Sequence, residues 1–514
     1  MIFMAYMIKK NSFLIKIFLF LTIFVVYFCS RFQNLNSIPV FGDEAIYVRW
    51  SQIIKNEETL RFIPQTDGKQ PLFMWFTAVI FHFISDPLIA SRTISIISGS
   101  LIMLAIFLVT CIVVDFSFPA RDPIKFVKES IRDNFYYGFL SLLIYVFLPF
   151  SFFFDRLAVP DNTLSMFGVW SLFFLLLLAK FRRLDLALIL GMVLGLSWLT
   201  KSPAIYFVVL SVFTYLVFNL KRLKTAYLPI ISAALAFVIY NILRLGPQFQ
   251  MIALRNKDYI WTLGEILKHP LDPLKPHLGD ALVIFGQYIS WPILIFAIIG
   301  LFLFLFYKKN TQFFVLAAWS FLPLIANSAM AKVFTARYIL FILPPLVVMM
   351  GVGLSVFFKN NLSKIIFILI LLIPNILWIK NISINPFQVK LSSTETGYLS
   401  GWTSGWGIKE AADFLKLRSQ EVNVIVGTEG AFGTLPDGLQ IYTDHVNQLT
   451  VLGLGLGFTQ IPDRLVNARA YGDEVYLLMN QSRFSVSSLD QEKLQLIKSY
   501  PKPDGDSLLL YQLK

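Results

Sequence analysis

The sequence has few charges, few histidines and almost no cysteine. Charged residues make up 15% of its 514 positions, and it contains 4 histidines and 2 cysteines. Cys29 and Cys111 fall inside two apolar runs, near opposite ends, so a disulfide between them is not expected and cysteine says nothing about redox compartment. A Gly-x-x-x-x-Gly-Lys phosphate loop is also lacking, which excludes an ATP site of that kind.

Apolar residues are abundant instead. The sequence is 56% hydrophobic and 16% aromatic, and long runs almost without charge recur along most of the chain. The net charge of +13 would fit a nucleic-acid-binding protein, but the basic residues form short clusters between apolar runs and no continuous stripe. The composition therefore predicts a polytopic membrane protein.

The apolar runs are long enough to cross a bilayer. Crossing roughly 30 Å of hydrocarbon takes about 20 mainly apolar residues, and about eleven segments qualify. They are 13–30, 87–114, 135–153, 163–178, 184–199, 203–220, 226–243, 281–307, 313–329, 338–358 and 365–378. No small-x-small cleavage pattern follows the first segment, so we expect an uncleaved span. The stretch 71–84 is apolar but short, and is predicted to be an interfacial or re-entrant helix.

Basic residues cluster in alternate connections between these segments. After the second, fourth, sixth, eighth and tenth segments lie Arg121, Lys125, Lys128 and Arg132; Lys180, Arg182 and Arg183; Lys221, Arg222 and Lys224; Lys308 and Lys309; and Lys359 and Lys364. Lysines also precede the first segment. The positive-inside rule places all of these in the cytoplasm. We therefore expect a multi-pass protein of the cell membrane with a cytoplasmic N-terminus and an external C-terminal tail.

The tail differs in composition from the rest of the chain. From about residue 381 polar residues and glycines increase, which predicts a membrane domain over 1–380, with a first external loop over 31–86, and an external soluble domain over 381–514. A helix is expected in "GWGIKEAADFLKLRSQ" and strands in "EVNVIVG", "DEVYLLM" and "DSLLLYQLK", giving a small α/β or α+β fold. "VLGLGLGF" lacks nucleotide-loop spacing and is predicted to be a glycine-rich turn.

Charged residues gather at the external ends of separate spans. The carboxylates are Asp43, Glu44, Asp155 and Asp161, and the cations are Lys69, Arg156, Lys201 and Arg337. The adjacent pair Asp43 and Glu44, taken alone, would also fit the solvated start of a loop helix. A bundle could instead bring these ends together, with carboxylates to take a proton from a hydroxyl and cations to neutralise a phosphate.

The order of these motifs resembles a known family. It runs "GDEAIY" after the first span, then "KQPLF", "RLAVPDN", "GLSWLTKSP" and "ARYILFILPPL". This resembles the bacterial branch of the dolichyl-phosphate-mannose-protein mannosyltransferases, and is similar to the lipid A aminoarabinose transferases; both are GT-C membrane glycosyltransferases. The resemblance implies an all-α membrane domain of GT-C type with about 11 transmembrane helices, and an external domain behind it.

The resemblance implies an activity. It is transfer of a sugar, hexosyl or pentosyl, from a polyprenyl-phosphate donor to a protein, lipid or glycan on the outer face, with inversion. Asp43 would act as general base on the acceptor hydroxyl or at least orient it, and Glu44 would position the loop or help to bind the acceptor. Tyr47, one helical turn after Asp43, would hydrogen-bond within the site. At Ile46 the aminoarabinose transferases carry an arginine, which favours a mannosyltransferase-like role.

The same resemblance assigns the other charges. Lys69 matches the lysine of a Lys-Pro-Pro-Leu pattern, although Gln70 replaces the first proline, and would contact the carrier phosphate. Asp161 would help to bind substrate. Arg156, Lys201 and Arg337 would add positive charge around the phosphate.

The loop "KHPLDPLKPHLGD" contains two of the histidines. His269 and His277 are eight residues apart with prolines between them, which makes a poor pair of metal ligands, so loop histidines are favoured. His277 is the better candidate for a substrate contact. A divalent metal ion stays open, and no other cofactor is expected.

Two other classes of function compete with an enzyme. A secondary transporter or lipid flippase would place ionisable residues near the bilayer midplane within repeated halves, whereas these spans are nearly free of charge and no internal repeat is evident. An inactive family member could act as a sensor through its tail. The joint presence of Asp43, Lys69, Asp161 and Lys201 favours the enzyme.

Overall fold

The computed structural model describes residues 2–117, 119, 122–307 and 311–514. Arg121, Lys308 and Lys309 of the charge argument lie outside this part. The chain forms two compact units. The bundle unit comprises 1–33, 62–73 and 94–380, and the sheet unit comprises 34–61, 74–93 and 381–514.

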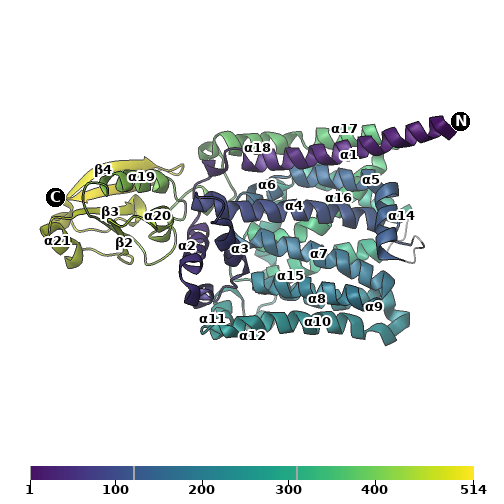
Figure 1. The fold of residues 1–514 in the computed structure, drawn as a ribbon, viewed down its shortest axis with the longest axis horizontal. Helices are drawn as coiled ribbons and strands as arrows, with labels where there is room; N and C mark the ends of the chain where they lie inside the picture. The colour runs from purple at the N-terminus through teal and green to yellow at the C-terminus, as the bar shows by residue number, and fades with distance from the viewer. Residues whose placement is uncertain (1, 118, 120–121, 308–310) are drawn as a thin grey trace. The chain divides into compact units, whose positions relative to one another are not determined.

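The bundle unit consists of helices, the longest of which lie alongside one another (Figure 1). Its helices are α1 (Ile2–Phe32), α4 (Pro87–Val114), α5 (Pro123–Phe147), α6 (Pro149–Asp155), α7 (Pro160–Phe181), α8 (Leu184–Thr200), α9 (Ile205–Asn219), α10 (Tyr227–Tyr240), α11 (Phe249–Tyr259), α12 (Leu263–Lys268), α13 (Leu274–Tyr288), α14 (Trp291–Tyr307), α15 (Thr311–Met330), α16 (Leu343–Leu354), α17 (Asn361–Leu371) and α18 (Ile373–Ile384). The first turns of α4 and the end of α18 fall in the sheet unit.

Many of these helices could cross a membrane. Within the described residues, 7 helices are long and apolar enough, and up to 10 if each of three bent pairs is one span. The bent pairs are α5 with α6, α13 with α14, and α17 with α18. The shorter apolar helix α8 falls on the remaining predicted segment. These helices confirm the predicted polytopic helical fold. The physical reason is that backbone N–H and C=O groups in hydrocarbon have no water to bond to, so long apolar runs form helices.

Helix α3 (Leu72–Ile80) falls on the short apolar stretch between the first two spans. Its 9 residues span about 14 Å at 1.5 Å per residue, roughly half the hydrocarbon thickness. Among the described residues it is not one of the helices that could cross. Three short 3-10 helices lie at or next to charged residues discussed below. They are η3 (Ile63–Asp67), just before Lys69, η4 (Ser202–Ala204), just after Lys201, and η7 (Ala336–Ile342), which contains Arg337.

The sheet unit is built on five strands. They are β1 (Val424–Thr428), β2 (Leu449–Gly453), β3 (Glu474–Asn480), β4 (Leu494–Pro501) and β5 (Ser507–Leu513), in the order β2-β1-β3-β5-β4. The strands β2, β1 and β3 run parallel to one another, with Val426 opposite Val451 and Tyr476. Strand β5 runs antiparallel to both of its neighbours, β3 and β4. The expected small α/β domain is therefore confirmed.

Helices α19 (Ile408–Arg418) and α21 (Asp463–Ala470) lie on opposite faces of this sheet. The other helices of the unit are α2 (Gly42–Asn56), α20 (Asp437–Thr443) and α22 (Ser488–Gln491). Leu465 of α21 packs in one core with Leu477 of β3, whose neighbour Tyr476 points to the other face and contacts Phe414 of α19. The alternation along β3 is the period of two that strands impose, so this part of the chain forms three layers.

The chain after the first span is part of the sheet unit. The Gly42 N–H donates to the Thr403 carbonyl at 3.0 Å, and the Gly405 N–H donates to the Val40 carbonyl at 2.8 Å. Helix α2 packs against α20, where Gln52 Nε2 donates to the Ile441 carbonyl at 2.8 Å. The division of the chain into 1–380 and 381–514 stays a prediction, but segment 34–61 packs with segment 381–514.

Candidate functional site

Asp43 lies in the first turn of α2. The helix begins after Phe41, whose extended backbone N–H donates to Glu44 Oε2 at 3.0 Å, so a side chain three residues on caps the helix start. Gly42 is needed here because a Cβ would lie 2.9 Å from Thr434 Oγ1. Asp43 itself is partly exposed and lines a cavity of the sheet unit. A carboxylate in a cavity wall can act as a general base.

Glu44 is fully buried beside Asp43. It holds Arg92, near the start of α4, at two points: Arg92 Nε lies 2.9 Å from Oε1 and Nη2 lies 2.8 Å from Oε2. Arg92 also donates to the carbonyls of Leu35, Ile38 and Pro39. The pair ties the loop before α2 to α4, which is what a loop-positioning role requires.

Tyr47 lies one turn after Asp43 and is 4% exposed. Its ring is 6.1 Å from that of Trp50 on the same helix. The structure therefore places Tyr47 on the packed side of α2.

The bundle unit groups several predicted phosphate contacts around one tyrosine. Lys201 follows α8 and lies with Nζ 2.6 Å from Asp161 Oδ1 in the first turn of α7. The same ammonium lies 4.5 Å from the centre of the Tyr338 ring, and the Arg337 guanidinium lies 5.0 Å from that centre. The pKa of Lys201 is lowered, mainly by burial of the ammonium. The Asp161 carboxylate acts to raise this pKa, whereas the positive charges of Arg337 and Lys69 lower it further.

Lys69 belongs to the same group of cations. Its Nζ donates to the Tyr259 hydroxyl at 3.0 Å and lies 3.9 Å from Asp67 Oδ2. Burial alone would lower the pKa of Lys69, but Tyr259, Asp67 and Tyr338 outweigh it, so the pKa is raised and the ammonium stays charged at neutral pH. We call Lys69, Lys201 and Arg337 the cation cluster. Three cations grouped in this way are suited to an anion such as phosphate.

Two further predicted residues have contacts of other kinds. Arg156 follows α6, is fully buried, lies 4.9 Å from the Phe152 ring and donates to the Gln33 carbonyl at 3.0 Å. His277 Nδ1 lies 2.9 Å from the Ser328 carbonyl, and its ring stacks 4.9 Å from Phe334. Of the residues the structure describes, no three His, Cys, Asp or Glu side chains form a group that could hold a metal ion.

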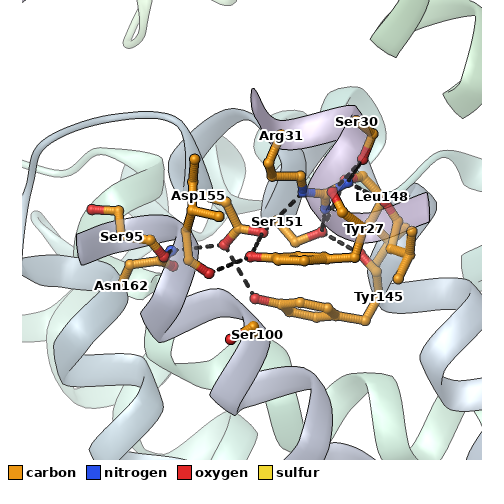
Figure 2. Close-up of polar contacts among 12 residues, drawn as sticks. Tyr27, Ser30, Arg31, Ser95, Ser100, Tyr145, Leu148, Ser151, Asp155 and Asn162 are labelled. Carbon is orange, nitrogen blue, oxygen red and sulfur yellow. Dashed lines mark hydrogen bonds and ion pairs between the residues drawn. The ribbon is translucent and has the colours of Figure 1, made fainter. Parts of the chain in front are cut away.

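Sequence reasoning did not foresee how Asp155 is held. This buried carboxylate accepts hydrogen bonds from the Tyr27 hydroxyl at 3.1 Å, Arg31 Nε at 3.2 Å, the Tyr145 hydroxyl at 3.2 Å and Asn162 Nδ2 at 2.7 Å. Figure 2 shows these contacts. The residues come from α1, α5, α6 and α7. Both oxygens of Asp155 are therefore hydrogen-bonded, as a buried carboxylate requires. Since the donors come from different helices, these bonds connect the helices of the bundle unit. The available signal was Arg31, a charge directly after the predicted first span and in the last turn of α1.

Arg92 was also missed. It sits inside the predicted span 87–114, where an ionisable residue needs a partner, so its position in the sequence was a signal that such a partner exists. The sequence does not reveal that the partner is Glu44, 48 positions earlier.

The comparisons with known proteins agree with the fold. A model of the family described as dolichyl-phosphate-mannose-protein mannosyltransferase matches residues 128–243. The structure is similar to that of ArnT from Cupriavidus metallidurans in the apo state, with a TM-score of 0.56 and 14% identity over 98% of each chain. It is also similar to the same protein bound to undecaprenyl phosphate, with a TM-score of 0.55, 15% identity and coverage of 96% of this chain and 97% of the other.

The fold and the family match together indicate a multi-pass membrane protein that resembles members of the GT-C glycosyltransferase class. The predicted resemblance to the bacterial mannosyltransferase-like members of that class is confirmed by both comparisons. No curated protein sequence matches the chain.

Proposed function

We propose that the protein transfers a sugar from a polyprenyl-phosphate donor to a hydroxyl acceptor, with inversion, on the outer face of the membrane. The cation cluster with its neighbour Asp161 is the observation that carries this proposal. Lys69 and Lys201 are part-buried and Arg337 is buried, so their positive charges are poorly screened by water and attract an anion, and a lipid-linked phosphate is such an anion. Binding of undecaprenyl phosphate by the similar ArnT supports this donor class.

The chemistry needs few groups. The acceptor oxygen attacks the anomeric carbon and forms the new glycosidic bond. The bond between that carbon and the phosphate oxygen breaks, and its electron pair leaves with the polyprenyl phosphate, whose charge Lys69, Lys201 and Arg337 stabilise. The acceptor proton passes to the Asp43 carboxylate. Glu44 acts as a positioning residue through Arg92, and the donor supplies the energy.

The orientation and the donor sugar belong to the same proposal. Basic connections such as Lys221, Arg222 and Lys224 would lie in the cytoplasm, and the sheet unit would lie outside. Isoleucine at position 46 supports a mannosyltransferase-like sugar over aminoarabinose. Acceptor classes to be tested are a protein, a lipid and a glycan.

The test is transfer of labelled sugar from synthetic polyprenyl-phosphate donors by the purified full-length protein, with a membrane extract as acceptor. Asp43→Asn should abolish transfer. The matched control is Asp463→Asn, which changes an exposed carboxylate in the first turn of a helix of the same unit and should leave transfer unchanged. Absence of transfer from every donor would overturn the glycosyltransferase proposal, and full activity of Asp43→Asn would exclude Asp43 as the base.

A further inference from the structure

The sheet unit contains a cavity of about 480 Å³. Its wall includes Asp43 together with Trp402, Glu429, Phe432, Leu456 and Arg483. A volume of this size is typical of pockets that take a small-molecule-sized group, and a mainly apolar wall with a few polar groups is the usual composition of such pockets.

The cavity lies where parallel strands end. Glu429 and Gly430 directly follow β1, Gly455 and Leu456 follow β2, and Arg483 follows β3. In open α/β sheets the crevice outside the carboxyl ends of parallel strands is the usual place for a ligand. Gly430 and Gly455, with φ of +79° and +85°, let the loops after β1 and β2 turn back and pair with each other. The glycine-rich turn of the sequence is therefore part of the cavity wall.

The polar groups of the cavity are held in place. Glu429 is 4% exposed and accepts from the Asn480 backbone N–H at 2.9 Å and from Asn480 Nδ2 at 2.6 Å. Lys502 donates to Asn480 Oδ1 at 2.5 Å and to the carbonyls of Gly401 and Ser404 at 2.8 and 2.7 Å. These bonds fix the segment that carries Trp402 to the end of β3.

An aromatic surface faces a cation at the rim. The Arg483 guanidinium lies 3.5 Å from the centre of the Trp402 ring, and Trp402 is 44% exposed. Trp402, Phe432 and Leu456 are exposed apolar residues of the cavity wall, which we call the rim, and the carboxylates of Asp43 and Glu429 belong to the same wall. Stacked aromatic rings bind the apolar C–H face of a sugar, while carboxylates and arginine hydrogen-bond its hydroxyls.

We propose that this cavity is the acceptor site, and that it takes a terminal sugar of a glycan or glycolipid. This proposal rests on the proposed function, because Asp43 in the wall is the base that would receive the hydroxyl proton. Two carboxylates favour hydroxyl donors and disfavour a phosphate or another anion. An extended peptide would pair along the side of an edge strand, whereas the cavity lies at the strand ends. The acceptor oxygen bonds to the donor's anomeric carbon, its proton goes to Asp43, and polyprenyl phosphate leaves with the electron pair.

The first test measures binding without catalysis. The methyl glycosides of mannose, glucose, galactose, N-acetylglucosamine and arabinose, and a pool of Ser/Thr peptides, are offered to the full-length protein in detergent, and contact is read by saturation-transfer difference NMR. At least one glycoside should bind. Its affinity should fall about tenfold, or ~1.4 kcal/mol, in Trp402→Ala. Tyr471→Ala removes an aromatic ring that is 89% exposed elsewhere in the unit and should change nothing.

A second variant guards against misfolding. Leu456 is 65% exposed at the rim, so Leu456→Trp should fold normally and narrow the cavity, with the same loss of glycoside binding. Binding of no glycoside, binding unaffected by both variants, or binding of peptides alone would overturn the proposal. Asp43→Asn should still bind the glycoside while losing transfer, so glycoside binding without any transfer by the wild type would point to failure of the proposed function and not of the cavity assignment.

Discussion

Glu44 and Arg92 form a two-point ion pair in which neither side chain is exposed, with nitrogen-to-oxygen distances of 2.9 and 2.8 Å. Arg92 adds hydrogen bonds to three carbonyls of the loop before α2. A buried pair of this kind is a poor stabiliser when compared with apolar side chains, but removing one partner leaves a buried charge. Its role is to fix the loop before α2, which leads directly into the helical turn that carries Asp43.

Glu44→Gln should therefore destabilise the protein by about 3–5 kcal/mol and reduce sugar transfer, because it leaves the Arg92 guanidinium without a balancing charge. The measurement is the thermal unfolding temperature of the purified protein in detergent, followed by transfer activity below that temperature. Asp133→Asn, which removes the exposed Arg132–Asp133 pair, should leave both unchanged. A normal unfolding temperature with no transfer would instead assign Glu44 directly to catalysis.

Lys201→Met should weaken use of the donor. Charge-assisted hydrogen bonds contribute about 1.5–3 kcal/mol, so the donor kcat/KM should fall roughly tenfold to a hundredfold. Lys257→Met removes an exposed lysine of the α11 helix and should leave the donor kcat/KM unchanged. Equal values for wild type and Lys201→Met would exclude Lys201 from the phosphate site.

Gly99→Ala should destabilise the bundle unit. A Cβ at this position would lie 2.1 Å from Tyr27 Oη and 2.5 Å from Asp155 Oδ1, so it would push apart the group shown in Figure 2. Overpacking costs about 1–3 kcal/mol, more than the helix gains on replacing glycine. Gly264→Ala in α12, where a Cβ meets nothing within 4 Å, is the matched control and should keep or raise the unfolding temperature. The same unfolding temperature in Gly99→Ala and wild type would show that the Asp155 group tolerates displacement.

Lys502 should make stability depend on pH. Burial lowers the pKa of Lys502 from 10.5 to about 8. Between pH 8 and pH 10.5 Lys502 is protonated in the unfolded chain but not in the folded protein, so the free energy of unfolding rises with pH. Below about pH 8 the folded protein carries the buried charge, and its full cost, roughly 3 kcal/mol, is present. Lys502→Met should remove this rise.

The check is the unfolding free energy of the full chain in detergent at intervals from pH 7.5 to 10.5. The free energy of unfolding of the wild type minus that of Lys502→Met should increase with pH. Lys498→Met, at an exposed position on β4, should keep the wild-type slope. Parallel pH curves for wild type and Lys502→Met would contradict the lowered pKa.

Much of the helical fold follows from the sequence, because hydrocarbon allows the backbone no partner other than itself. Each predicted apolar segment falls on a helix or a bent helix pair. The tail's helix at 408–418 and its strands at 424–428, 474–480 and 507–513 were likewise readable from local periodicity. The sequence also indicated, by their shared predicted side, that Lys69, Lys201 and Arg337 would gather.

Other features depend on contacts between residues far apart in the chain, for which local pattern has no signal. Only the tertiary structure pairs Glu44 with Arg92, surrounds Asp155 with four donors, and packs segment 34–61 with segment 381–514. The cavity arises in the same way, from the ends of three strands and the first turn of α2. The sequence determined which segments are helices or strands and which charges stand at their ends, whereas packing decided which of those charges are buried in pairs and which line a cavity.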